Sequence, residues 1–75
     1  MKIEIYGKQN CAYCNEAKAF LKLKSFPFTY TDIEDIPLDD VGAIVTKTGA
    51  KTFPIIFIDE EYIGGYRELK GVING

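Results

Sequence analysis

The sequence predicts an α/β fold with the element order β-α-β-α-β-β-α, in which a four-stranded mixed sheet is flanked by helices. Short runs of alternating or continuous apolar residues predict the strands, and longer stretches with apolar residues at helical spacing separate them. With 75 residues, 47% of them hydrophobic, the chain has the composition of one small globular domain. We therefore expect residues 1–75 to form a single domain.

The first strand and the first helix lie on either side of a short loop. Residues 2–6 alternate polar and apolar side chains before Gly7, which predicts a strand that ends at the glycine. Good helix formers follow from Cys11 to about Lys24, and Asn10 is the expected N-cap. The first helix should therefore begin at the first cysteine.

The middle of the chain predicts a second strand and a second helix. The Ser-Phe-Pro segment at 25–27 breaks the first helix, and the aromatic and threonine residues of 28–33 predict a strand. Apolar residues at helical spacing begin at Leu38, and this helix should end after Lys47 because Gly49 is a typical stop signal. A helix joins the first two strands, so these should pair in parallel.

The last third of the chain predicts a hairpin and a terminal helix. Pro54 opens the nearly continuous apolar run of 55–59, which is typical of a central strand covered on both faces. A tight connection at 60–61, a short strand at 62–63, two glycines at 64–65 and a helix over about 66–73 follow. This order is typical of the three-layer thioredoxin-like fold, with the first strand-to-helix junction outside the carboxyl end of strand one.

Charge and hydropathy exclude two classes of partner. The formal net charge is -2, whereas a nucleic-acid-binding domain normally presents a concentrated basic surface. The longest apolar runs, such as 55–58, are far shorter than a membrane span, and the N-terminus lacks the pattern of a signal peptide. We therefore expect neither nucleic acid nor membrane as a partner, and a cytoplasmic location.

Cys11 and Cys14 leave several interpretations to compare. A structural disulfide across two intervening residues closes a very small loop, so it stabilises the fold less than a bridge that closes a long one. A structural zinc site needs about four ligands, and this chain has two cysteines and no histidine. Two small buried apolar residues are a third interpretation. The C-x-x-C spacing at a strand-to-helix junction favours a fourth, a redox pair without a metal site.

The position of Cys11 at a helix start indicates how such a pair would react. A thiolate attacks disulfides far better than a thiol does, and cysteines at helix starts have pKa values of roughly 3.5–7.5 instead of about 8.5. Lys8 adds a positive charge shortly upstream. Cys14 lies one helical turn further on, within reach of Cys11, and is expected to be the resolving thiol.

Three separate segments resemble glutaredoxin motifs, in the order that this family has. They are residues 8–14 (Lys-Gln-Asn-Cys-Ala-Tyr-Cys), residues 52–54 (Thr-Phe-Pro) and residues 64–69 (Gly-Gly-Tyr-Arg-Glu-Leu). The resemblance covers essentially the whole chain and is to small dithiol members of the bacterial or bacteriophage type. It implies a glutathione-dependent thiol–disulfide oxidoreductase that has no tightly bound cofactor and takes glutathione as its reductant.

The resemblance also implies a glutathione groove beside Cys11. The tyrosine between the cysteines would form one wall of the groove. The backbone of Phe53, which precedes a proline expected to be cis, would pair with the cysteinyl part of glutathione. Backbone N–H groups at the start of the last helix would hold one carboxylate, and Lys8 would contact the other. By this resemblance the glutathione-binding residues are Lys8, Tyr13, Thr52, Phe53, Pro54, Gly65, Tyr66 and Arg67.

The implied protein is a monomer whose partners are glutathione and disulfide-containing or glutathionylated proteins, with ribonucleotide reductase as one candidate. Two positions depart from the family pattern: Arg67 stands where an acidic or hydroxyl residue is usual, and Ala12 where proline is common. A guanidinium favours a carboxylate over the amino group of glutathione. A glutaredoxin-like redoxin reduced by thioredoxin reductase is therefore an alternative. Another is a glutathione-assisted iron–sulfur cluster carrier, in which two chains each supply Cys11.

Overall fold

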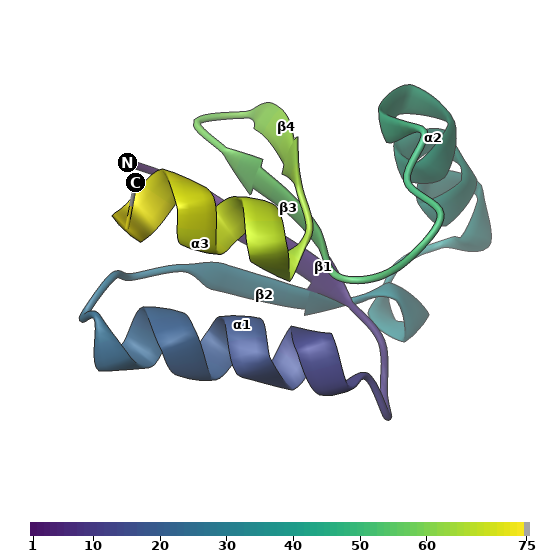
Figure 1. Ribbon diagram of the computed structural model, residues 1–75. Helices are drawn as coiled ribbons and strands as arrows, with labels where there is room; N and C mark the ends of the chain where they lie inside the picture. Colours follow the sequence, from purple (N-terminus) through teal and green to yellow (C-terminus); the bar gives the residue numbers. More distant parts are fainter. Residues whose placement is uncertain (75) are drawn as a thin grey trace.

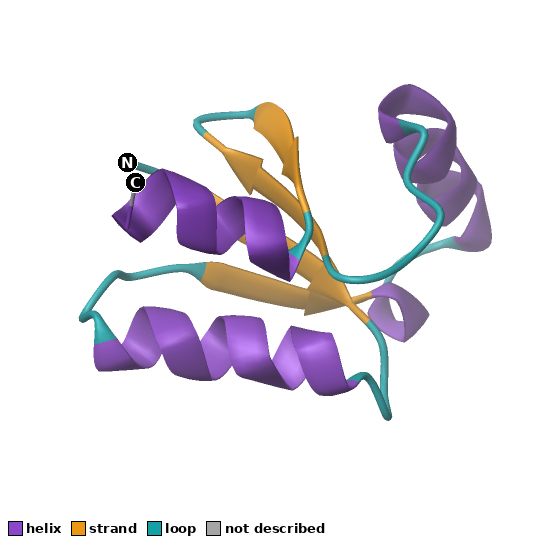
Figure 2. Cartoon of the chain, viewed as in Figure 1, coloured by secondary structure: helices purple, strands orange, loops and turns teal. Residues whose placement is uncertain are grey.

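The structure is a computed structural model that describes residues 1–74. Its elements follow the predicted order, with one short 3-10 helix added. They are β1 (Ile3–Gly7), α1 (Ala12–Leu23), β2 (Thr29–Asp32), the 3-10 helix η1 (Ile33–Asp35), α2 (Leu38–Thr48), β3 (Ile55–Ile58), β4 (Glu61–Gly64) and α3 (Tyr66–Asn74). Figures 1 and 2 show α1 and α3 side by side, whereas α2 lies apart from them.

The strands form one mixed sheet with the order β2-β1-β3-β4. β1 pairs in parallel with β2, where Ile5 lies opposite Tyr30, and antiparallel with β3, where Ile5 lies opposite Ile56. β3 and β4 form the expected antiparallel hairpin. All residues of β3 are buried, as its continuous apolar run predicts for a central strand. The predicted fold class is confirmed.

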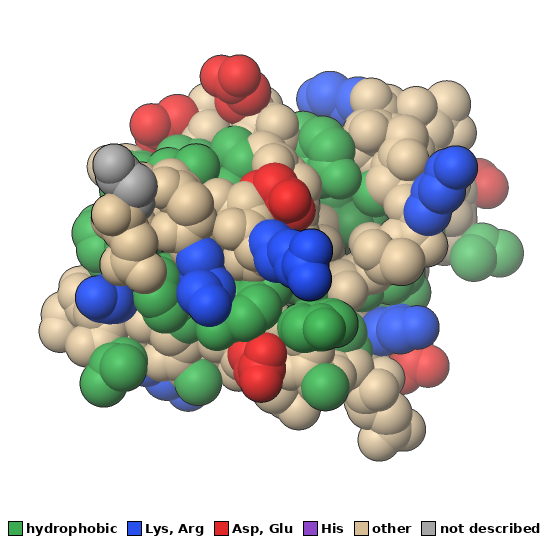
Figure 3. All heavy atoms as spheres, viewed as in Figure 1, with side chains coloured by type: hydrophobic (Ala, Val, Ile, Leu, Met, Phe, Trp, Pro, Cys, Tyr) green, Lys and Arg blue, Asp and Glu red, His purple; other side chains and the backbone are tan. Residues whose placement is uncertain are grey.

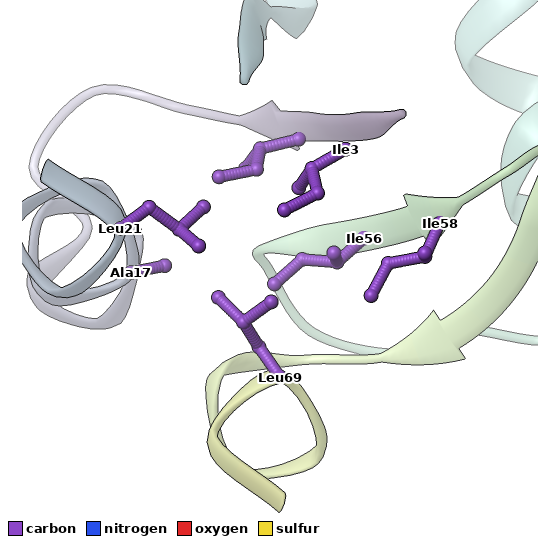
Figure 4. Packing of buried hydrophobic residues seen from close by; sticks show 7 residues of the cluster. Ile3, Ala17, Leu21, Ile56, Ile58 and Leu69 are labelled. Atoms are coloured by element: carbon purple, nitrogen blue, oxygen red, sulfur yellow. The ribbon is translucent and has the colours of Figure 1, made fainter. Parts of the chain in front are cut away.

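The hydrophobic core lies between the sheet and the helices α1 and α3 (Figure 4). Alternate side chains of β1 and β3 face this core, because successive residues of a strand point to opposite faces of a sheet. α1 contributes Ala17 and Leu21, and α3 contributes Leu69, all of them without exposed surface. Figure 4 shows Leu69 pointing toward Leu21 and Ile56. This packing fixes α1 and α3 relative to the sheet.

The opposite face of the sheet is covered only in part by α2. The apolar spacing correctly predicts this helix, but none of its side chains is buried, and Leu38 is 84% exposed. Side chains of β1, β3 and α2 surround a cavity of about 220 Å³ there. We conclude that α2 is held less firmly than α1 and α3, because few apolar contacts attach it.

The N-cap of α1 is Cys11, so the expectation of Asn10 at this position is wrong. Asn10 has a φ of 57°, outside the extended region that an N-cap residue adopts. Cys11 is extended, and its sulfur accepts the N–H of Cys14. A cysteine sulfur thus takes the part that a serine or asparagine side chain usually plays.

Two further boundaries differ from the expectation. β2 ends at Asp32, whose carboxylate accepts the N–H of Glu34 and starts η1. The hairpin turn lies at Asp59 and Glu60, which both have positive φ, one residue earlier than expected. Within the described residues, no helix is long and apolar enough to cross a membrane.

Candidate active site

The end of β1 and the start of α1 position Cys11. The chain leaves the sheet at Gly7, where a Cβ would lie 2.8 Å from Cε1 of Tyr30, so no larger residue fits without a shift of that ring. After the loop, the carbonyl of Cys11 accepts the N–H of Asn15 over 3.1 Å and begins α1. The N–H groups of the first helical turn have no partner within the helix, so they are available near the cysteine sulfur.

Cys11 and Cys14 form a disulfide, with their Cα atoms 5.2 Å apart. The N–H of Cys14 also donates to Sγ of Cys11 over 3.2 Å. The two side chains differ in access, because Cys11 is 8% exposed and Cys14 is 0% exposed. An attacking thiolate can therefore approach the sulfur of Cys11, and after reduction the Cys14 N–H stabilises the Cys11 thiolate.

The loop before β3 closes one side of the disulfide. Its Phe53–Pro54 peptide bond is cis, as the family resemblance implies, and Pro54 is buried. The carbonyl oxygen of Phe53 lies 3.8 Å from Sγ of Cys11. Backbone polar groups of this loop thus lie next to the reactive sulfur.

A cavity of about 250 Å³ adjoins this loop. Residues from the start of α1, the loop before β3 and the start of α3 form it. The lining residues are Tyr13, Thr52, Phe53, Pro54, Gly65, Tyr66, Arg67 and Glu68. Seven of the eight residues expected to bind glutathione are therefore brought together here, although they come from three distant segments of the chain.

Two stacked tyrosines form one wall of the cavity. The ring centroids of Tyr13 and Tyr66 lie 6.1 Å apart, with an angle of 29° between the planes. Phe20 packs edge-on against Tyr66, with the centroids 6.2 Å apart. Tyr13 is still 58% exposed. A ligand at this wall therefore meets a flat apolar surface that the protein has already ordered.

The start of α3 also lines the cavity, and Glu68 is the residue that the sequence analysis missed there. The N–H of Gly65 donates to Oε1 of Glu68 over 2.8 Å, and the carbonyl of Gly65 accepts the N–H of Leu69. Glu68 thus supplies the glutamate half of a capping box for α3. The sequence pattern that could have identified this cap is a glutamate three positions after Gly65, the residue that precedes α3.

Gly64 has a φ of 122°, and a Cβ there would lie 2.6 Å from Cγ of Glu68. At Gly65 the nearest atom to an added Cβ would be the carbonyl oxygen of Pro54, at 3.5 Å. The first glycine is therefore required by its backbone conformation and by the cap. The second lines the cavity, while its N–H and carbonyl are both used in the cap of α3.

The two cationic residues of the expected site lie in different places. Arg67 lines the cavity and is exposed. Lys8 does not line it; its Nζ lies over the ring of Phe53, 5.7 Å from the centroid. Within residues 1–74 the ion pair that forms joins Lys2 to Glu4, so neither Arg67 nor Lys8 is neutralised by a carboxylate there. Both remain available to an anion.

Metal-ligand residues do not gather in this part of the molecule. Among residues 1–74, no group of three or more histidine, cysteine, aspartate or glutamate side chains is placed to hold a metal ion.

Comparisons with known proteins agree with this geometry. Residues 3–63 match the model of the Glutaredoxin family. Over 71 residues the chain is 38% identical to Glutaredoxin 3 of Escherichia coli K12, an alignment that covers 89% of this chain and 80% of that protein. It is also 38% identical over 80 residues to a glutaredoxin of Haemophilus influenzae, covering 97% of this chain and 91% of the relative.

A solved structure extends the likeness to the backbone. The crystal structure of Glutaredoxin 1 from Francisella tularensis superposes with a TM-score of 0.75 at 32% sequence identity. The superposition covers 99% of this chain and 98% of the Francisella chain. The likeness therefore includes every element that surrounds the disulfide.

Proposed function

Because the chain belongs to the glutaredoxin family, we propose that it is a glutathione-dependent enzyme that reduces protein disulfides and glutathionylated proteins. Thiol–disulfide exchange is the activity of the family, and glutathione as the reductant is the finer part that we propose for this chain. The observation that carries it is the disulfide between Cys11, which is 8% exposed, and Cys14, which has no exposed surface, next to a cavity of about 250 Å³.

The forward reaction begins with the reduced pair. The Cys11 thiolate attacks one sulfur of the substrate disulfide, forms a mixed disulfide and releases the other sulfur as a thiolate. The Cys14 thiolate then attacks Sγ of Cys11, which restores the Cys11–Cys14 disulfide and releases the second substrate thiolate. Two electrons pass from the enzyme to the substrate, and the released thiolates take up two protons.

Glutathione returns the enzyme to its starting state. A first glutathione thiolate attacks Sγ of Cys11, forms a mixed disulfide there and releases Cys14. A second attacks the glutathione sulfur of that mixed disulfide and releases the Cys11 thiolate together with oxidised glutathione. Attack at Cys11 is favoured over attack at Cys14 because the Cys14 side chain has no exposed surface.

The cavity suits a short peptide that carries a thiol and two carboxylates. The backbone of Phe53 beside Cys11 can pair with an extended peptide, and the stacked Tyr13 and Tyr66 can flank it. Lys8 has no carboxylate partner within the described chain and would attract one carboxylate, whereas Arg67 would lie beside the amino group of glutathione. We assign the glutathione site to these residues with Thr52, Pro54 and Gly65.

The cellular setting is proposed on the same basis. A dithiol reductase fed by glutathione works where glutathione keeps thiols reduced, which is the cytoplasm. We propose that the protein acts there as a monomer, and that ribonucleotide reductase is one candidate among its disulfide substrates. Reduction of that enzyme's disulfide, measured by nucleotide turnover with this protein as the electron donor, tests the last point.

Arg67 favours a second candidate, a redoxin whose electrons come from thioredoxin reductase. A guanidinium at this place in the cavity repels the amino group of glutathione. A site that binds glutathione poorly would need a protein reductant instead.

The two candidates are separated by the source of electrons. Turnover of a small mixed disulfide is followed by NADPH consumption, once with glutathione and glutathione reductase and once with thioredoxin reductase. Activity only with glutathione supports the proposal. Activity only with thioredoxin reductase refutes it and makes the chain a redoxin. A Cys11→Ser variant measured beside each mixture supplies the background rate.

A further inference from the structure

An apolar strip runs along the groove between α1 and α3. It consists of Tyr13, Phe20 and Leu23 from α1 and Tyr66 from α3, and we call it the α1–α3 strip. Tyr66 contacts both Tyr13 and Phe20, and a cavity of about 250 Å³ opens beside them, lined by Phe20, Leu23 and Tyr66 together with Glu16 and Ala19. Leu23 is 82% exposed. Figure 3 shows green side chains between the two helices on this face.

The strip is flanked by cations that lack carboxylate partners. Nζ of Lys70 lies 5.2 Å from the ring centroid of Tyr66, and Nζ of Lys24 lies 5.9 Å from that of Phe20. The ion pair formed within residues 1–74 involves neither of them. In Figure 3, blue side chains lie along the upper margin of the green strip, and a red side chain lies at its lower margin. The strip therefore presents aromatic rings with the unneutralised ammonium groups of Lys24 and Lys70 beside them, and with one carboxylate, that of Glu16, at the cavity.

The charge of this helical layer is opposite to that of the whole chain. α1 with its cap residue Lys24, together with α3, carries five lysine or arginine residues and two glutamates. The net charge of the chain is nevertheless -2, so the acidic residues are concentrated elsewhere. Such a separation of charge steers acidic partners toward the basic face.

The strip is continuous with the redox site. Tyr66 lines both the cavity beside the disulfide and the cavity beside Leu23. A polypeptide whose disulfide lies at Cys11 can therefore continue along the groove between the helices without leaving the surface.

We propose that the α1–α3 strip is a docking surface for the protein substrate, and that it fits a segment in which a large apolar side chain is flanked by acidic residues. The apolar side chain would lie against Phe20 and Leu23, and the carboxylates would meet Lys24 and Lys70. This inference rests on the proposed disulfide exchange at Cys11, and it adds the class of protein segment that the enzyme prefers.

A pair of synthetic peptides tests this preference. Each contains one disulfide followed by a phenylalanine flanked by glutamates, or by glutamines in the matched peptide. The Lys24→Gln/Lys70→Gln variant should lower kcat/KM for the acidic peptide about fivefold and flatten its dependence on salt. It should leave the glutamine peptide and a small mixed disulfide unchanged. Leu23→Asn should lower kcat/KM for both peptides about threefold, because the contact is apolar.

Matched controls stand outside the α1–α3 strip. Lys2→Gln/Lys47→Gln makes the same change in net charge, and Leu38→Asn replaces a leucine that is as exposed as Leu23. Both should turn over the acidic peptide at the unsubstituted rate. Equal losses in the strip variants and the controls, or equal kcat/KM for the two peptides, would overturn the inference.

A binding measurement separates this inference from the proposed function. Peptides with serine in place of the cysteines carry a fluorescent label, and their anisotropy is followed as protein is added. Weaker binding of the acidic serine peptide to the Lys24→Gln/Lys70→Gln variant supports the docking surface even without turnover. Identical binding to all variants contradicts the docking surface whether or not the enzyme turns over small disulfides.

Discussion

The backbone N–H of Cys14 donates to Sγ of Cys11 over 3.2 Å, while the side chain of Cys14 has no exposed surface. The second cysteine thus acts on the first through its backbone as well as through its sulfur. This separates two roles that a substitution at position 14 can distinguish, because serine keeps the N–H and removes only the sulfur.

We predict different outcomes for the two cysteine variants. Cys11→Ser should reduce turnover of every disulfide to the uncatalysed rate, because the accessible nucleophile is gone. Cys14→Ser should keep deglutathionylation within a factor of about two and lose reduction of protein disulfides, which needs the resolving thiol. Both rates are measured by NADPH consumption. Retained protein-disulfide reduction in Cys14→Ser would show that Cys14 is not the resolving thiol.

Arg67→Asp should strengthen the use of glutathione. The carboxylate would attract the amino group of glutathione where the guanidinium repels it, so KM for glutathione should fall about fivefold, as expected for a partly exposed charge pair. Aspartate in the first turn of α3 also suits the helix dipole, so stability should not fall. Lys47→Asp on α2 is the control for net charge. An unchanged KM would place the glutathione amino group away from Arg67.

Two glycine substitutions should change stability in opposite directions. Gly64→Ala should lower the free energy of unfolding by about 2–4 kcal/mol, because φ is 122° and the new Cβ meets the Glu68 side chain that caps α3. Gly42→Ala, in α2 with no atom within 4 Å of the added Cβ, should raise it by about 1 kcal/mol. Denaturant unfolding of the oxidised proteins gives both values. An unchanged free energy of unfolding in Gly64→Ala would contradict the role of Glu68 as the cap of α3.

α2 should exchange its amide hydrogens faster than the other long helices. It has no buried side chain, and its N-cap residue, Pro37, makes no side-chain hydrogen bond. Its opening free energy should lie at least about 2 kcal/mol below that of β3. Hydrogen exchange read by NMR tests this, and Gly42→Ala should slow exchange in α2 about fivefold. Equal protection of α2 and α1 from hydrogen exchange would show that α2 is held as firmly as α1, although none of its side chains is buried.

The elements that could be predicted are those in which a single local pattern decides the outcome. The apolar run of β3 indicates a central strand, because no other place in a small domain buries every residue of a strand. The C-x-x-C spacing likewise indicates the redox pair, since the helix turn brings the two sulfurs together.

Other features depend on the tertiary fold. The apolar spacing of α2 predicts a helix, but it does not predict that none of the side chains of this helix is buried. The usual N-cap preferences did not predict the cap of α1, because a cysteine sulfur accepts the hydrogen bond there in place of a side-chain oxygen. Phe53 lies close to Cys11 only through the packing of β3 beside β1, so the cavity could be expected from family resemblance and not from local pattern.

Alkaline pH should destabilise the folded protein in part through Tyr30 on β2. Burial, and after it the negative charge of Asp32, raises the pKa of the Tyr30 phenol above its ordinary value of 10.0. The folded protein therefore holds the phenolic proton more tightly than the unfolded chain does. This contribution to stability is complete below about pH 10 and is lost as the pH rises from there through the higher pKa of the folded state.

Melting temperatures measured from about pH 8 to about pH 11 test this for Tyr30→Phe, which has no phenolic proton to hold. The fall in melting temperature above about pH 10 should be shallower in Tyr30→Phe than in the unsubstituted protein, because the proton-linked loss is removed. Tyr62→Phe alters a more exposed tyrosine on β4 and should keep the steeper fall. Parallel curves for Tyr30→Phe and the unsubstituted protein would mean that groups other than Tyr30 govern alkaline unfolding.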